Sequence, residues 1–201
     1  MAEPLTNVDL LLLDRWADTT GIRDAIKELE ERLANRLNAV AERLRPWLEA
    51  KGFVLLDVET KYAAVNVGKA GWVKNKEEVW VYITIAALFP FGYRRVEEEH
   101  PHVWIRSDGL SRSEQEAFQT EVSNRFKNRP GEWLNEECSR DWPAGRYIKT
   151  HGDVERSRLA QSEDAMEAFM KAELEPLLAL GDDVDAALRA ARGVKPSKAR
   201  G

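Results

Sequence analysis

Apolar residues recur at helical spacing over a long stretch near the N-terminus, and no other feature of the sequence limits the fold as strongly. The steps between them, all three or four residues, connect Ile22, Ile26, Leu29, Leu33, Leu37, Val40, Leu44 and Leu48. This spacing predicts one amphipathic helix over 22–50 whose apolar stripe persists for about seven turns. Gly52 supplies a stop signal, and from 53 to 62 the apolar residues alternate instead. The change of period predicts a half-buried strand directly after the helix.

The remaining sequence predicts further strands and then further helices. Strands are expected at 63–67, 78–88, 93–96 and 102–107, with a turn at 68–71. Ser111 and Glu114 have the spacing of a capping box, which predicts a helix to about residue 127. Later helices are expected at about 162–181 and 183–192, and an early one at 7–17, ended by Thr19-Thr20-Gly21. This order indicates an α+β fold, an antiparallel β-sheet meander flanked by a long N-terminal helix and C-terminal helices.

The same reading divides the chain into four parts. Residues 1–52 form the N-terminal helices, and 53–150 form a sheet core with a packed helix and a Trp-rich loop over 131–152. Residues 151–192 form the C-terminal helices, and 193–201 are expected to be a disordered tail.

Composition narrows the classes of function. The net charge is -5, whereas proteins that bind nucleic acid through phosphates usually carry a basic surplus. The only cysteine, Cys138, excludes a disulfide within the chain and fits a reducing compartment. The N-terminus lacks the basic region of a signal peptide, and the longest apolar run is too short to cross a bilayer. We therefore expect a cytoplasmic protein with no membrane partner.

One strand carries a candidate catalytic group. Asp57, Glu59 and Lys61 alternate on one face of the strand expected over 53–62. Glu59-Thr60-Lys61 matches the E-x-K half of the PD-(D/E)XK nuclease signature, in which carboxylates hold Mg²⁺ and the lysine stabilises charge. The second acidic ligand normally comes from an earlier strand, but the chain before residue 53 is predicted to be helical. The alternative interpretation is a solvated strand face.

Metal binding and nucleophilic catalysis have weaker signals. His100 and His102 form the one close pair of metal-ligand residues, with His151 and Cys138 as distant additions. Zinc sites use three or four such ligands at paired spacings. The alternative interpretation of the histidine pair is a charged loop, and no cofactor is expected.

Motifs for a nucleophile or for a phosphate-binding loop are absent from the sequence. The chain is expected not to be an enzyme, although this stays open.

A basic loop suggests a nucleic-acid surface. Lysines flank one aromatic residue in this loop, and arginines extend the patch: Lys69, Trp72, Lys74, Lys76, Arg94, Arg95 and Arg106. Lysines could contact phosphates while the tryptophan stacks on a base. Acidic and basic residues balance over 53–112, so a solvated turn is the alternative.

The long helix is the strongest candidate for a protein interface. Its stripe is longer than a small sheet needs, so Ile26, Leu29, Leu33, Leu37 and Val40 could contact a partner or a second copy. The alternative is that the helix packs across its own sheet. A small-molecule pocket lined by the tryptophans also remains open.

Several aromatic motifs between residues 38 and 150 are similar to a known domain. They are the helix end LEAKGF at 48–53, AGWV at 70–73, WVYI at 80–83, HVWI at 102–105 and DWPAGRYI at 141–148. In this order they resemble the accessory C-terminal domain of PD-(D/E)XK nuclease superfamily proteins of bacteria and phages. The catalytic core that precedes that domain has no counterpart in the sequence. The resemblance therefore implies a free-standing binding module from a defence or mobile-element setting, with no catalytic residue to carry over.

These observations lead to three hypotheses. The first is a non-catalytic protein-binding or regulatory module, with a homo-oligomer through helix 22–50 as one form of it. The second is a nucleic-acid-binding protein that uses the basic loop. The third is a metal-dependent nuclease centred on Asp57, Glu59 and Lys61.

Overall fold

The computed structural model describes residues 15–74, 78–89 and 100–193. The helices are α2 (Trp16–Ala50), α3 (Arg112–Phe126), α4 (Asp153–Gln161), α5 (Glu163–Leu178) and α6 (Gly181–Ala191). The strands are β1 (Val54–Glu59), β2 (Ala64–Gly68), β3 (Tyr82–Ala86), β4 (His102–Arg106) and β5 (Ala144–Tyr147). Two short 3₁₀ helices, η1 (Thr60–Tyr62) and η2 (Ala70–Trp72), follow β1 and β2.

The five strands form one sheet in the order β1-β2-β3-β4-β5, and every neighbouring pair is antiparallel. Each strand therefore lies beside the one before it, as in a meander. The predicted α+β class and antiparallel meander are confirmed.

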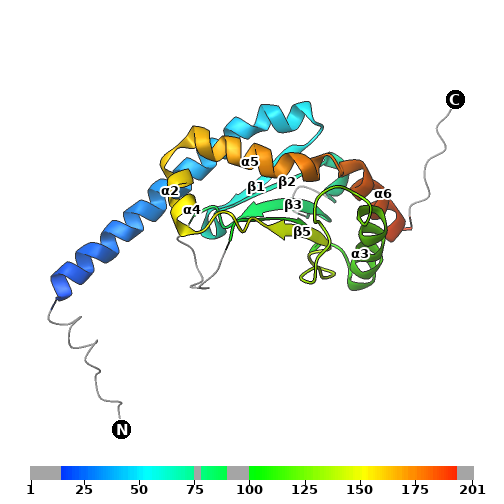
Figure 1. Ribbon diagram of the computed structural model, residues 1–201, viewed down its shortest axis with the longest axis horizontal. Helices are drawn as coiled ribbons and strands as arrows, with labels where there is room; N and C mark the ends of the chain where they lie inside the picture. The colour runs from blue at the N-terminus through cyan, green and yellow to red at the C-terminus, as the bar shows by residue number, and fades with distance from the viewer. Residues whose placement is uncertain (1–14, 75–77, 90–99, 194–201) are drawn as a thin grey trace, which may run out of the picture.

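Helices α2 and α5 run side by side over one face of the sheet (Figure 1). Alternate strand residues such as Val65, Ile83, Ile85, Val103 and Ile105 are fully buried and belong to one apolar core. The apolar residues of α2 from Leu33 to Leu48 and of α5 from Met166 to Leu178 join the same core. Packing of these two helices on the sheet forms the hydrophobic core, because it buries the apolar faces of α2, α5 and the strands.

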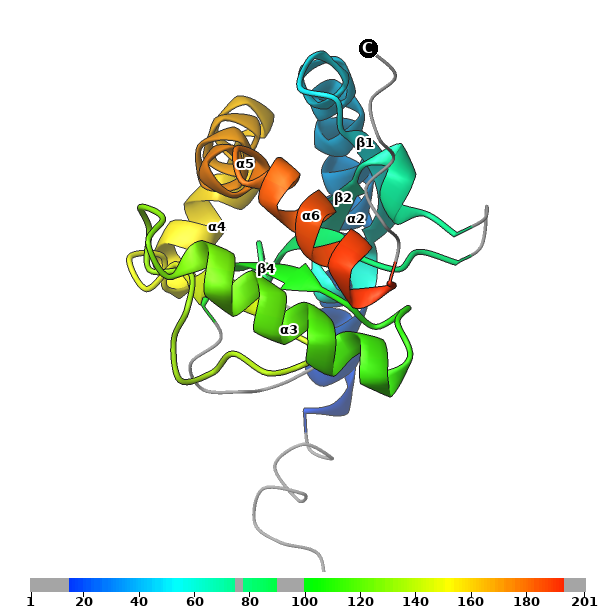
Figure 2. The same cartoon turned by 90° about the vertical axis from the view of Figure 1, so that its right-hand side faces the viewer.

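Helices α3 and α6 pack against each other beside one end of the sheet (Figure 2). The predicted capping box is present at the start of α3, where the Glu114 carboxylate accepts from the Ser111 backbone N–H at 2.9 Å. Phe118, Val122 and Phe126 are buried, as their spacing predicts. The local signals of α3 thus agree with its tertiary packing.

Helix α2 is continuous through Thr20-Gly21, so the predicted break there is wrong. A single glycine destabilises a helix by about 1 kcal/mol relative to alanine. A long helix such as α2 can accommodate this loss, because helical residues on both sides of the glycine continue its hydrogen bonding. Residues 7–14 of the expected early helix lie outside the described residues, as do 93–96 and the tail from 194 onward.

Two elements had no adequate local signal. Strand β5 lies within the expected loop at 131–152, and its sequence Ala-Gly-Arg-Tyr has little β-propensity. Helix α4 precedes the helix expected from 162, and it carries few apolar residues. Its Arg156 is buried and donates to the backbone oxygens of Ala87 and Phe89, so tertiary contacts anchor this helix.

Candidate interaction site

The N-terminal half of α2 projects from the body of the molecule, and we call its residues 16–32 the arm (Figure 1). Ile22 is 62% exposed and Ile26 is 46% exposed, whereas Leu29 is half-buried against the edge of the core. These three residues continue the apolar stripe that the core covers farther along the helix. The arm therefore presents an apolar face for which the described residues supply little cover.

The predicted interface on the long helix divides into two parts. Leu37 and Val40 are fully buried, and Leu33 is 7% exposed, in the core between α2, α5 and the sheet. They are not available to a partner, so their assignment to an interface was wrong. Ile26 and the half-buried Leu29, at the exposed end of the stripe, are the members of the predicted set that stay accessible, and Ile22 joins them.

Charged side chains along the arm and at its start form ion pairs within the chain. Arg15 pairs with Asp18, Arg23 with Asp24, and Arg32 with Glu28, at nitrogen–oxygen distances of 3.2 to 3.6 Å. All of these side chains are well exposed, so their ion pairs are weak and exchange easily for other partners.

The structure describes three members of the predicted nucleic-acid surface in the basic loop, Lys69, Trp72 and Lys74. The Lys69 ammonium lies 2.8 Å from carboxylate oxygens of both Asp182 and Asp185 on α6, and Lys74 pairs with Glu78 at 2.6 Å. Lys76, Arg94 and Arg95 lie outside the described residues. Lys69 is thus held against α6, whereas the ion pair of Lys74 is exposed and weak.

Trp72 is buried, with 0% exposed surface, and cannot stack on a base. Its ring packs edge-on against Phe53 at 5.7 Å, and its Nε1–H donates to Asp185. The prediction of a base-stacking role failed because local sequence does not reveal that α6 covers this loop.

The three residues of the predicted catalytic group do not all lie on one strand. Asp57 and Glu59 share one strand face, but β1 ends at Glu59 and Lys61 lies in η1, whose turn breaks the alternation. The Glu59 carboxylate accepts from Asn66 Nδ2 at 2.7 Å, across the sheet. Glu59 therefore helps to satisfy a buried asparagine, which is a structural role.

Aromatic side chains gather on the sheet face that lies opposite the core. The rings of His102 and Trp104 on β4 lie within 5.5 to 6.1 Å of those of Trp142 and Tyr147, in edge-to-face geometry. The Arg106 guanidinium stacks on Trp142 at 3.7 Å. Trp104 and Trp142 therefore pack with His102 and Tyr147 in one aromatic cluster on this face.

Of the predicted histidine pair, His102 belongs to this aromatic cluster, and both rings lie near backbone oxygens. His102 Nδ1 lies 3.3 Å from the backbone oxygen of His100, and His100 Nδ1 lies 3.5 Å from that of His151. In the part of the chain that the structure describes, no three His, Cys, Asp or Glu side chains gather in a way that could hold a metal ion. Burial raises the pKa of the Cys138 thiol, which makes it a poor nucleophile at neutral pH.

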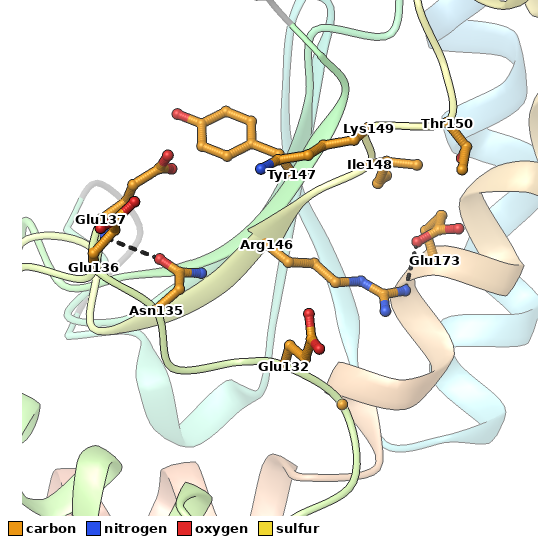
Figure 3. Close-up of a pocket in the computed structure, with 11 residues that line it drawn as sticks. Glu132, Asn135, Glu136, Glu137, Arg146, Tyr147, Ile148, Lys149, Thr150 and Glu173 are labelled. Carbon is orange, nitrogen blue, oxygen red and sulfur yellow. Dashed lines mark hydrogen bonds and ion pairs between the residues drawn. The ribbon is translucent and has the colours of Figure 1, made fainter.

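A polar hollow of about 630 Å³ lies beside β5, between the loop at 131–137 and residues 148–150 (Figure 3). Arg146 points across it toward Glu173 of α5, at 2.8 Å, and its guanidinium lies 5.0 Å from the Trp133 ring. Glu132, Glu136 and Glu137 and the basic Lys149 complete its charged lining. The acidic excess would favour a polar ligand with positive charge, and no sequence motif pointed to this hollow.

Neither a membrane-spanning helix nor a known relative identifies the function of this chain. None of the helices in the described part of the chain has both the length and the apolar character that crossing a bilayer requires. The chain matches no model of a known protein family, no curated protein and no solved structure.

Proposed function

We propose that this protein is a non-catalytic protein-binding module whose contact surface is the arm of α2. The supporting observation is the exposure of Ile22 and Ile26 on the same stripe that forms the core farther along the helix. Two large aliphatic side chains at helical spacing match the anchors of an amphipathic helix that binds another protein.

Helix energetics support this proposal. Helices in proteins gain most of their stability from packing of the apolar face, and the arm packs this face on little of its own chain. The arm also contains Gly21, a weak helix former. Covering Ile22 and Ile26 would stabilise the helix by up to about 1.5–3 kcal/mol for each side chain.

The alternatives have less support in the geometry. The nucleic-acid hypothesis is weakened because Trp72 is buried in the core and Lys69 forms ion pairs with Asp182 and Asp185. The nuclease hypothesis is weakened because Lys61 lies in η1 and not on the strand that carries Asp57 and Glu59. The proposed setting in bacterial or phage defence, or in mobile elements, rests only on the resemblance described above.

The test replaces the two exposed anchors. Ile22→Gln with Ile26→Gln removes the apolar face without adding charge, whereas Asp24→Gln with Glu31→Gln places the same residue type on the opposite face of the arm. Tagged forms of each variant would be used for capture from native cells, and binding of the recovered partner would then be measured by calorimetry. We expect the first pair to weaken binding at least about tenfold and the second to leave it unchanged.

Equal binding by both double variants would contradict the proposal. Thermal melting monitored by circular dichroism provides the control for folding, since exposed substitutions typically change stability by no more than about 0.5 kcal/mol.

A further inference from the structure

We propose that the partner of the arm is the arm of a second copy of this chain, aligned antiparallel. This inference rests on the proposed function and makes it specific. It follows from the charges that flank the apolar face, because they complement themselves in one orientation.

Helix geometry places the charges on two flanks. With 100° between successive residues, Ile22, Ile26 and Leu29 fall within a sector of about 60°. Arg23 and Glu30 lie along one flank of that sector, and Asp18 and Arg32 lie along the other. Each flank thus carries one positive and one negative residue, separated by about two to four turns.

In an antiparallel pair, each flank faces the same flank of the other helix. A register that centres between Ile26 and Lys27 brings Arg23 opposite Glu30 of the second copy, and the two-fold symmetry repeats this contact. Asp18 and Arg32 meet within one turn of the same register. Four contacts between opposite charges result, and Leu29 falls between Ile22 and Ile26 of the second copy.

A parallel pair is less complementary. There, opposite flanks meet, so Arg23 faces Asp18, but Glu30 faces the uncharged Ala25. The two bodies would also lie side by side, since each encloses its own α2 from Leu33 onward. Antiparallel arms instead place the bodies at opposite ends of the paired helices, which the projection of the arm allows (Figure 1).

The charges on the arm are available for such contacts. Arg23 pairs with its neighbour Asp24, and Arg32 pairs with Glu28, but all four side chains are more than half exposed. Exposed pairs of this kind contribute little, so the arms can exchange them at small cost.

Charge reversal tests both the dimer and its orientation. The mass of the full chain would be measured over a range of concentrations by sedimentation equilibrium. Arg23→Glu alone, or Glu30→Arg alone, turns two attractive contacts into repulsive ones, so each should weaken dimerisation about tenfold. The double variant Arg23→Glu/Glu30→Arg restores the antiparallel contacts, so its dissociation constant should return to within about threefold of wild type.

The other outcomes overturn the inference in distinguishable ways. Failure of the double variant to recover would overturn the antiparallel orientation. The wild-type chain could stay monomeric while Ile22→Gln/Ile26→Gln abolishes binding of a different protein in the capture assay. That outcome would overturn self-association and leave the proposed function standing. If every variant behaved like the wild type in sedimentation and in partner capture, both the dimer and the proposed function of the arm would be overturned.

Discussion

At the scale of single residues, neighbours from distant segments decide what each charged side chain does. Burial disfavours the charged form of Lys69, but hydrogen bonds and ion pairs with Asp182 and Asp185 outweigh it and raise the lysine pKa. Asp185 also accepts from Trp72 Nε1 at 2.5 Å. A lysine and a tryptophan that read as a nucleic-acid contact thus connect the loop after β2 to α6.

His102 should make the stability of the protein depend on pH. Burial lowers the pKa of this imidazole, so the folded state favours its neutral form. As pH falls, the unfolded chain binds the proton first, and the stabilising contribution, complete above about pH 6.5, declines. Urea unfolding at pH 7.5 and pH 5.5 should show a smaller loss of stability in His102→Gln than in wild type. An equal loss in both proteins would show that His102 does not couple folding to protonation.

At the scale of elements, β5 depends on a close approach that only glycine permits. A Cβ added at Gly145 would lie 2.4 Å from the Trp104 ring and 2.5 Å from the Val103 backbone oxygen. The Gly145 N–H donates to the Trp133 backbone oxygen at 2.9 Å, and its own oxygen accepts from Asn135. Strand β5 is therefore fixed between β4 and the loop that precedes it.

Gly145→Ala should destabilise the protein by at least about 1–3 kcal/mol, because the ring of Trp104 and the strand cannot both keep their positions. Chemical denaturation with tryptophan fluorescence would measure this loss. Gly71→Ala is the matched control, since nothing lies within 4 Å of a Cβ at that position. Similar stability of the two variants would mean that β5 can shift away from Trp104.

At the scale of the whole molecule, α2 belongs to two environments. Its C-terminal half is a core element between α5 and the sheet, while its N-terminal half projects as the arm. The two halves differ in what covers the stripe, although both carry it at the same spacing.

Truncations that remove the same number of carbon atoms should therefore differ greatly in their effect on stability along this one helix. Leu37→Ala removes a fully buried side chain and should cost about 2–5 kcal/mol, whereas Ile26→Ala should cost less than about 0.5 kcal/mol in the monomer. Urea unfolding at high dilution measures both without a contribution from association. A comparable loss from Ile26→Ala would indicate that the arm is covered within its own chain.

Elements with strong local signals were predictable. The stripe of α2, the capping box of α3 and the β-rich runs of β3 and β4 each specify their own conformation over a few residues. The antiparallel meander followed from the order of these elements, because consecutive strands with short connections pair with their neighbours.

Other features depended on contacts between distant segments. Strand β5 exists because β4 and the Trp133 loop satisfy its backbone, and α4 is anchored through Arg156. The apolar stripe gives no indication of where cover ends, because periodicity shows only that one face of a helix is apolar. What covers that face depends on where α5 and β1 come to lie, so the tertiary structure alone separated the core half of α2 from the arm.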